Sequence, residues 1–482
     1  MLRTVFIFIF ICLFAVSVKA SNKPNVILIY ADDLGQGLLG CYGQKIIKTP
    51  HIDSLADEGV RFTNAHGSVY CAPARATLLT GLHEGRRNVW NISAGGKTIA
   101  LDKGKLQEVK HPMKGHKQAE KEEVFLAQIA QKAGYKTAQF GKLDWGFQTT
   151  HERLKRHGWD YYLGYMDHVR AHGFYPTYLW RNGKRLLLPG NTHLNAGKTK
   201  ESYSKAMTAK RRDKTGKKHY SQNVFIKDLL KFIGDNKRRP FFIYHSTQLP
   251  HGPVDIPEVH KDFKNDSRLT DVEKEYASMV KMLDDHVGLI LKKLKRLKLD
   301  RNTVIFFVSD NGHETYYLKG GKGRTRKRNY HGENDVFKGT AGLAGMKWTR
   351  WQGGLAVPLI ARWPGKFKKG KVSSLLTANY DFMPTLAELM RGKMPKGKDG
   401  ISLVSELKGK KVQKKHDHIF IDNNVLITAD GWKLLKANQR FYLFNIKKDP
   451  GEYKDLAETD PKKLNALMKV FKKEQNSQRG DL

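Results

Sequence analysis

Short runs of consecutive hydrophobic residues alternate with amphipathic helical patterns along most of the chain. Uninterrupted runs are typical of strands covered on both faces, and they predict strands at Asn25–Ala31, Tyr135–Phe140, Pro240–Tyr244 and Asn302–Val308, with a strand and turn at Val357–Gly365. Helical patterns predict helices at Thr49–Gly59, Ala74–Thr80, Glu120–Ala133, Val224–Asp235, Leu269–Leu299 and Asp381–Arg391. The alternation predicts an α/β sandwich on a large, mostly parallel sheet, in which ligands bind beyond the carboxyl ends of the strands.

The composition changes at about Lys393, where Lys, Gly and Pro become frequent, which indicates a domain boundary. Four short strands are predicted beyond it, followed by a helix at Asp460–Gln475: His418–Asp422, Val425–Ala429, Lys433–Ala437 and Phe441–Ile446. We therefore expect a larger domain at residues 21–392 and, at residues 393–482, a smaller domain with a four-stranded antiparallel sheet and a helix.

Residues 1–20 have the pattern of a signal peptide. Arg3 gives a positive start, Val5–Val18 is apolar, and Val18-Lys19-Ala20 is a cleavage pattern. A retained membrane anchor is the alternative, but the apolar run is short for a membrane span. We expect cleavage after Ala20, export, and no stable membrane anchor afterwards.

The chain is strongly basic, with a formal net charge of +39 from 86 Lys and Arg against 47 Asp and Glu. Such a charge indicates an anionic partner, and nucleic acid, anionic lipid and sulfated polysaccharide are all candidates. A solvated basic surface with no particular partner is the alternative. The basic stretch at residues 198–218 has few large apolar residues and is expected to be a mobile surface excursion.

Polar side chains follow several of the predicted strands. They are Asp32 and Asp33, Lys142, His251, and Asp310 with Asn311. If these strands are parallel, the side chains converge on one edge of the sheet. Adjacent buried carboxylates are unfavourable without a cation. Three carboxylates and an amide oxygen suit Ca²⁺ or Mg²⁺, and the thiolate or multiple-His ligation typical of zinc is not evident.

Cys71 begins the stretch Cys71-Ala72-Pro73-Ala74-Arg75, which runs on to Leu79-Thr80-Gly81. Pro73 is tolerated in a first helical turn, and Gly81 is a helix terminator. Cys71 is therefore expected at a helix N-terminus, where negative charge is favoured. Read alone, it also fits a buried structural cysteine.

This stretch, Cys-x-Pro-x-Arg followed by Leu-Thr-Gly, resembles the signature of the formylglycine-dependent, arylsulfatase-like (type I) sulfatases. The resemblance extends from about Asn25 to the C-terminus, through motifs in the family's order: Asn25–Gly35, Gly141-Lys142, Pro250-His251-x-Pro253, Ser309-Asp310-Asn311-Gly312, and Gly345-Met346-Lys347 with Gly353-Gly354, Val357-Pro358 and Trp363-Pro364-Gly365. It implies an alkaline-phosphatase-like sandwich and a sulfuric ester hydrolase.

The resemblance also implies the roles of individual residues. Cys71 would be oxidised to formylglycine by a formylglycine-generating or anaerobic sulfatase-maturating enzyme, and a hydroxyl of the aldehyde hydrate would attack sulfur. Ca²⁺, with Mg²⁺ as second choice, would be ligated by residue 71 with Asp32, Asp33, Asp310 and Asn311. Other roles follow in the same way: Arg75 would hold the hydrate, Lys142 and Lys347 would neutralise sulfate oxygens, and His251 would protonate the leaving alcohol.

With Cys12 removed and Cys71 modified, Cys41 has no disulfide partner, which is typical of a bacterial periplasmic or extracellular protein. The substrate class and the basic charge suggest a sulfated polysaccharide or oligosaccharide. His168, Arg170 and His172 are candidate sugar-binding residues, with His313 a further candidate or merely a neighbour of the site. The basic loop Gly320–Arg328 is a candidate for distal sulfate contacts.

Three positions depart from the family pattern. Asp144 stands where a His is frequent, Gln352 where a Glu is frequent, and Ala356 where an Arg is frequent; the last two are expected to alter scaffold contacts. These departures leave two alternatives open: a non-catalytic polyanion-binding homologue, and a phosphodiesterase or phosphonate hydrolase of the same superfamily. A nucleic-acid-binding protein is less favoured, because export and an acidic cluster argue against it.

Overall fold

The computed structural model describes residues 23–86, 123–145, 149–168, 170–192, 205–318 and 328–477. The predicted signal peptide and most of the loop Gly320–Arg328 lie outside these residues, so the expectations for them stay predictions. None of the helices in the described part of the chain has the length and hydrophobicity of a membrane span.

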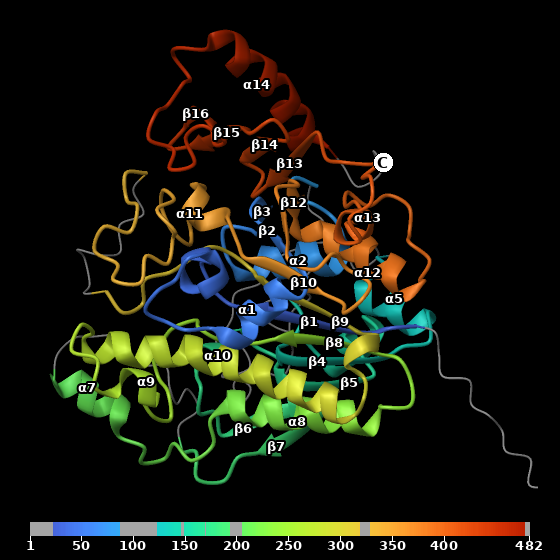
Figure 1. Cartoon of the computed structure of the whole chain (residues 1–482), viewed down its shortest axis with the longest axis vertical. Helices are drawn as coiled ribbons and strands as arrows, with labels where there is room; N and C mark the ends of the chain where they lie inside the picture. Colours follow the sequence, from blue (N-terminus) through green and yellow to red (C-terminus); the bar gives the residue numbers. More distant parts are fainter. Residues whose placement is uncertain are drawn as a thin grey trace, which may run out of the picture.

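A mixed sheet forms the centre of the molecule (Figure 1). In the described residues its ten strands follow the order β11-β2-β10-β9-β1-β8-β4-β5-β6-β7. The five from β9 to β5 are parallel to one another, and β10, β6 and their outer neighbours add antiparallel pairs. The bounds of the ten are β1 Asn25–Ala31, β2 Val60–Phe62, β4 Lys136–Lys142, β5 Tyr161–Tyr165, β6 Tyr178–Arg181, β7 Lys184–Leu187, β8 Phe241–Ser246, β9 Thr303–Ser309, β10 Leu359–Arg362 and β11 Lys371–Ser373.

Helices cover both faces of this sheet, which explains the unbroken hydrophobic runs. Alternate residues of β1 point to opposite faces. Ile27 and Ile29 pack with α1, α8 and α10, and Val26 and Leu28 pack with α2, α5 and α12. Figure 1 shows the same two layers. The helix bounds are α1 Pro50–Asp57, α2 Cys71–Thr80, α5 Leu126–Lys132, α6 His151–Arg156, α7 Lys205–Arg212, α8 Ser221–Asp235, α9 Lys261–Lys264, α10 Asp271–Arg296, α11 Gln352–Leu355, α12 Phe382–Met390, α13 Val404–Leu407 and α14 Pro461–Asn476, with short 3₁₀ turns at Gln36–Leu38, Gly40–Tyr42, Arg170–His172, Asp300–Asn302 and Asn379–Asp381.

The last part of the chain forms the predicted four-stranded antiparallel sheet, in the order β13-β14-β15-β16. Its strands are β13 His418–Ile421, β14 Val425–Thr428, β15 Trp432–Ala437 and β16 Arg440–Asn445. One face packs on α14, and the other packs on residues of the larger part, including Trp351 and Tyr380. A further pair, β3 Ala65–His66 and β12 Thr377–Ala378, lies between the two sheets in Figure 1. A domain boundary at residue 393 stays a prediction.

The sequence was a poorer guide to residues 123–218. Helix α5 is shorter than predicted, and strands β5, β6 and β7 were not expected. The sequence predicts that the basic stretch at residues 198–218 is a mobile surface excursion. For the described residues of this stretch the prediction is wrong, because α7 packs on the body of the molecule. Buried Arg211 pairs with Glu275 at 2.6 Å, and Lys214 and Lys217 pair with Asp255 at 3.2 and 3.0 Å.

Candidate active site

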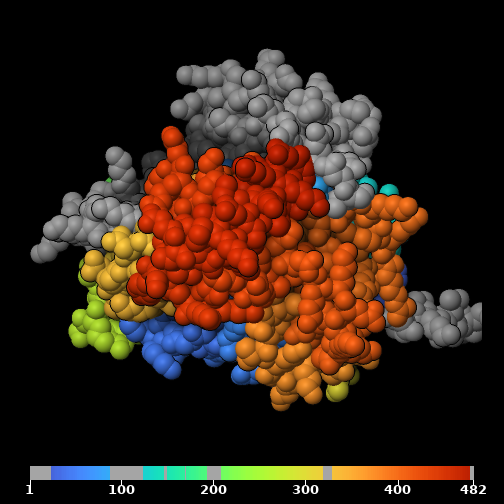
Figure 2. Space-filling view, turned by 90° about the horizontal axis from the view of Figure 1, so that it is seen from above, coloured from blue at the N-terminus to red at the C-terminus, as the bar shows by residue number. Residues whose placement is uncertain are grey.

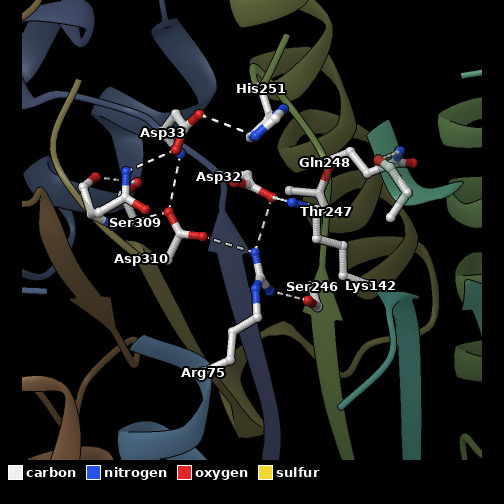
Figure 3. Close-up of polar contacts among 12 residues, drawn as sticks. Asp32, Asp33, Arg75, Lys142, Ser246, Thr247, Gln248, His251, Ser309 and Asp310 are labelled. Atoms are coloured by element: carbon white, nitrogen blue, oxygen red, sulfur yellow. Dashed lines mark hydrogen bonds and ion pairs between the residues drawn. The ribbon is translucent and has the colours of Figure 1, made fainter. Parts of the chain in front are cut away.

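The carboxyl ends of four neighbouring strands bring the predicted polar residues together (Figure 3). Asp32 and Asp33 follow β1, Asp310 follows β9, and Lys142 ends β4. All four side chains are fully buried. Because β9, β1, β8 and β4 are adjacent and parallel, their ends form one edge, as the sequence predicted.

Cys71 opens helix α2, whose N-terminus lies over this edge. The ligand atoms of Cys71, Asp32 and Asp310 lie within 4.8 Å of one another. Burial raises the pKa of the Cys71 thiol, whereas cysteines that act as thiolate nucleophiles have lowered pKa values. This site therefore does not activate Cys71 as a thiol. Helix α2 ends at Gly81, whose φ of +68° is the left-handed conformation expected of a glycine terminator.

Arg75, one turn along α2, connects two of the carboxylates (Figure 3). Its Nη2 lies 2.9 Å from Asp310 and 3.1 Å from Asp32. Its Nη1 donates to Ser246 at the end of β8. The guanidinium thus holds the two carboxylates in place, a contact that the predicted role at the hydrate did not include.

Asp33 has its own set of partners. Its Oδ2 accepts from Lys347 Nζ at 2.8 Å and from the Tyr316 hydroxyl, and its Oδ1 accepts from Asn311 Nδ2 at 2.8 Å. Its backbone φ is +63°, an uncommon conformation that Asp tolerates better than most residues. Such strain is found at functional sites, where surrounding contacts hold it.

The three carboxylates of the site face three cationic side chains, Arg75, Lys142 and Lys347, yet two features of their oxygens stay unfavourable. Burial and the neighbouring Asp32 raise the pKa of Asp310 to about 8. Oδ1 of Asp32 and Oδ1 of Asn311 are buried and accept no hydrogen bond from any described residue. A hard divalent cation among these oxygens would relieve both problems. The residues present therefore fit a metal site.

Two buried lysines each contact one aspartate of the pair. Lys142 Nζ contacts Asp32, and Lys347 Nζ contacts Asp33. Although burial opposes it, Asp33 and Cys71 raise the pKa of Lys347 above its ordinary value. Lys347 is therefore an ammonium group that faces the carboxylates from inside a water-poor pocket.

His251 closes the site from the segment after β8. Burial, reinforced by Lys347 and Lys142, holds its pKa well below the ordinary value, so the imidazole is neutral. Its Nδ1 lies against the Gly252 carbonyl, which assigns the proton to Nδ1. Nε2 is then the acceptor nitrogen, 3.5 Å from Asp33 Oδ2.

Three of the four candidate sugar-binding residues, His168, His172 and His313, lie near the carboxylate cluster. His172 stacks on His251, and His168 is buried close enough to Lys142 and Arg75 for both to lower its pKa in addition to burial. The Arg170 guanidinium lies over the Tyr178 ring, 4.2 Å from its centroid. His313 is buried against the Tyr317 hydroxyl at 2.8 Å. The structure thus brings His168 and His172 close to the site, and His313 also contacts it through the Asp33 backbone, whereas Arg170 contacts the Tyr178 ring.

The three departures from the family pattern have local partners. Asp144 accepts from Thr149 Oγ1 and pairs with His157 Nδ1, each at 3.0 Å. Gln352 contacts His66 and Lys433, each at 3.2 Å. Ala356 forms a backbone bridge with His66. Gln352 and Ala356 thus lie among scaffold residues, and the expectation that their departures alter scaffold contacts stays a prediction.

Two polar residues of the site were not predicted. Ser246 contacts Arg75, and Tyr316 donates to Asp33. The predicted strand Pro240–Tyr244 stops two residues too early. Had it been extended to its observed end, Ser246 would have been recognised as a polar residue at a strand end. Tyr316 lies in irregular chain after the Asp310 motif, where the sequence pattern carries no signal.

The chain matches two family models. One, described as Sulfatase, covers residues 24–393, and the other, described as N-sulphoglucosamine sulphohydrolase, C-terminal, covers residues 347–480. The chain is 28% identical over 485 residues to arylsulfatase D of Homo sapiens, covering 86% of this chain and 74% of that one. It is 26% identical over 514 residues to the N-acetylgalactosamine-6-O-sulfatase of Bacteroides thetaiotaomicron, covering 94% and 93%.

A similar solved structure comes from Bacteroides thetaiotaomicron and is reported with the metabolism of multiple glycosaminoglycans. It covers 95% of this chain and 100% of its own, with a TM-score of 0.72 at 22% identity. This likeness confirms the predicted alkaline-phosphatase-like fold class.

Proposed function

This chain belongs to the sulfatase family and is a sulfuric ester hydrolase, and on that premise we propose that it removes sulfate from a sulfated polysaccharide or oligosaccharide. We propose further that it uses a formylglycine made from Cys71 and a calcium ion. The observation that carries this proposal is the position of Cys71, buried at a helix N-terminus within 4.8 Å of two carboxylates.

The residues that would hold the ion are Asp32, Asp33, Asp310, Asn311 and residue 71. All their donor atoms other than that of residue 71 are oxygens, which favours Ca²⁺ over softer metals, with Mg²⁺ as second choice. When bound, the ion would polarise a sulfate oxygen as a Lewis acid.

Maturation of Cys71 would replace a protonated thiol by an aldehyde hydrate, which supplies an oxygen nucleophile. A formylglycine-generating or anaerobic sulfatase-maturating enzyme is the partner this requires. Arg75 would keep Asp32 and Asp310 at the spacing seen here, because it donates to both.

The two lysines would bind the sulfate group. In this structure the ammonium groups of Lys142 and Lys347 contact Asp32 and Asp33. Once the carboxylates have a cation, the ammonium groups become available to sulfate oxygens on which charge develops during the transfer. Because both lysines are already buried in place, they need little reorganisation.

His251 would hold the proton for the leaving alcohol at Nε2. A neutral histidine must first gain that proton, and an anionic sulfate beside it favours the charged form. The low pKa of His251 in the substrate-free site therefore keeps the imidazole neutral, and able to accept a proton, until substrate binds.

The carbohydrate substrate class follows from a relative and from charge. The Bacteroides thetaiotaomicron relative is named for a sulfated amino sugar, and the net charge of +39 suits a polyanionic substrate. We also propose export after cleavage at Ala20, and domains at residues 21–392 and 393–482.

The decisive experiment combines mass spectrometry with sulfate release. Protein from its own host should give a peptide Phe62–Arg75 with the formylglycine mass at position 71, and it should release sulfate from sulfated oligosaccharides. Cys71→Ala should abolish release, and Cys41→Ala, outside the site, serves as the matched control. An unmodified Cys71 together with absent release would overturn the mechanism and favour a binding protein. Preferential cleavage of phosphonate or phosphodiester esters would favour the other alternative.

A further inference from the structure

Trp348 stands beside the site with 45% of its surface exposed, unusual for so large an apolar residue. Its indole stacks on the Tyr70 ring, with centroids 4.4 Å apart and planes 20° apart. Tyr70 immediately precedes Cys71, and Trp348 immediately follows Lys347. The stacked pair therefore joins the two segments that supply the nucleophile position and a catalytic lysine.

The backbone of Trp348 is held in a conformation that bulky residues rarely adopt. Its φ is +70°. The Trp348 N–H donates to the Val69 carbonyl at 2.8 Å, and the Lys347 N–H donates to the His313 carbonyl at 2.8 Å. This strained backbone leaves an aromatic ring exposed next to the catalytic site. Backbone strain is found at functional sites, so the combination points to a binding role for the ring.

A groove of about 410 Å³ begins at Trp348 and runs toward the C-terminal sheet. It separates the segment Trp348–Trp351 from the turn that joins β15 to β16. Its walls include Arg328, Trp348, Arg350, Trp351, Asn438 and Tyr442, and no acidic residue is among its described lining residues. Figure 2 shows the C-terminal part, in red, beside the gold segment that precedes Trp348, and the stacked rings of His331 and Tyr453, 4.1 Å apart, join the two. The groove thus lies where two parts of the chain meet.

The two arginines give the groove its charge. Arg328 Nη1 donates to the carbonyl oxygens of Glu452 and Tyr453, each at 3.2 Å, and pairs with no carboxylate among the described residues. Arg350 donates to Asp422 through Nε at 2.6 Å, a contact that uses only one of its five N–H donors. Guanidinium groups with unused donors suit sulfate or other tetrahedral anions.

Aromatic faces and guanidinium groups that keep unused N–H donors together fit a ligand that has both an apolar face and anionic substituents. A sulfated sugar ring has both, since one face of a pyranose presents C–H groups. The volume of the groove lies within the usual range of small-molecule sites. Lys347 Nζ lies 5.6 Å from the centroid of the Trp348 ring, so a sugar on Trp348 would adjoin the one whose sulfate reaches Lys347.

We propose that this groove is a subsite for a second sulfated sugar, with Trp348 as the stacking surface and Arg328 and Arg350 as the anion contacts. The proposal rests on the proposed function and deepens it. The preferred substrate is then an oligosaccharide that carries a sulfate beyond the one removed, and the C-terminal sheet takes part in choosing it.

The test measures binding in a Cys71→Ala background, so that turnover does not interfere. The probes are size-defined sulfated oligosaccharides from chondroitin sulfate, heparin and carrageenan, titrated by calorimetry. For the probe that binds best, we expect Trp348→Ala and Arg328→Gln each to raise Kd about tenfold. Arg212→Ala, an exposed arginine on α7, is the matched control and should leave Kd unchanged. Arg328→Gln carries the test if Trp348→Ala does not fold.

An unchanged Kd in the Trp348 and Arg328 variants, or no binding of any probe, would overturn the subsite. A small aryl sulfate separates this role from a structural one. In the Cys71 wild-type background, Trp348→Ala should lower kcat/KM for the oligosaccharide more than for the aryl ester, and an equal loss on both would overturn the proposal. The proposed function fails separately, if the wild-type enzyme releases sulfate from none of these compounds.

Discussion

The rings of His172 and His251 lie face to face, with centroids 4.5 Å apart and an angle of 1° between their planes. Burial holds the pKa of both well below the ordinary value, and each cation would disfavour the other. The stack therefore keeps His251 in one orientation and permits at most one of the two rings to carry a positive charge.

A positioning role for His172 predicts different results from two substitutions. His172→Ala removes the ring on which His251 packs and should lower kcat about tenfold with little change in KM. His172→Phe restores a flat ring and should recover most of that loss. Steady-state kinetics on one sulfate ester would distinguish this role from sugar binding, because a sugar contact would raise KM in both variants.

Replacing Arg75 should damage stability as well as activity. Arg75→Ala leaves Asp32 and Asp310 buried without their shared guanidinium, and loss of one partner from a buried ion pair costs about 3–5 kcal/mol. We expect a large fall in Tm in calcium-free buffer, partly reversed by Ca²⁺, which would neutralise the same carboxylates. Differential scanning fluorimetry with and without Ca²⁺ measures both effects. An equal Tm loss under both conditions would contradict a metal at these residues.

Removing the proposed metal with a chelator should change both the stability and the activity of the protein. The oxygens of Asp32 and Asn311 that no described residue satisfies are available to ligate the proposed cation, so we expect EDTA to lower Tm and abolish sulfate release, and Ca²⁺ to restore both. Asp33→Asn, which removes one proposed ligand charge, should weaken the Ca²⁺-dependent rise in Tm. His260→Asn, at the N-terminal end of α9, is the control.

The strand ends of the site were predictable because two simple regularities coincide there. Unbroken hydrophobic runs mark the parallel strands, and the polar residue after each run falls on the same edge, as for Asp32 and Asp310. The contacts of Arg75 could not be read in this way, since a helical side chain reaches its partners only after α2 has packed on the sheet. Tyr316 lies in irregular chain, and its contact with Asp33 follows from tertiary structure alone.

The position of α7 is a second feature that the sequence pattern could not predict. A run of basic residues with little apolar content reads as a solvated excursion, but Arg211 is buried because Glu275 of α10 faces it. Local composition cannot supply that partner, which lies far along the chain.

Glu84 makes the contact between the active-site segment and the C-terminal sheet sensitive to pH. It accepts from Ser68, three residues before Cys71, and from the Asp422 N–H at 2.5 Å. Burial and the nearby Asp422 raise the pKa of Glu84 to about 8. A raised pKa in the folded state means that the contribution of Glu84 to stability is fully present below its pKa in the unfolded chain, about 4.3, and is lost as pH rises through 8.

Tm should therefore fall between pH 5 and pH 9 more steeply in the wild type than in Glu84→Gln, which mimics the protonated form. Glu58→Gln, a more exposed carboxylate that pairs with Arg362, is the control, and parallel profiles for the wild type and Glu84→Gln would contradict this account.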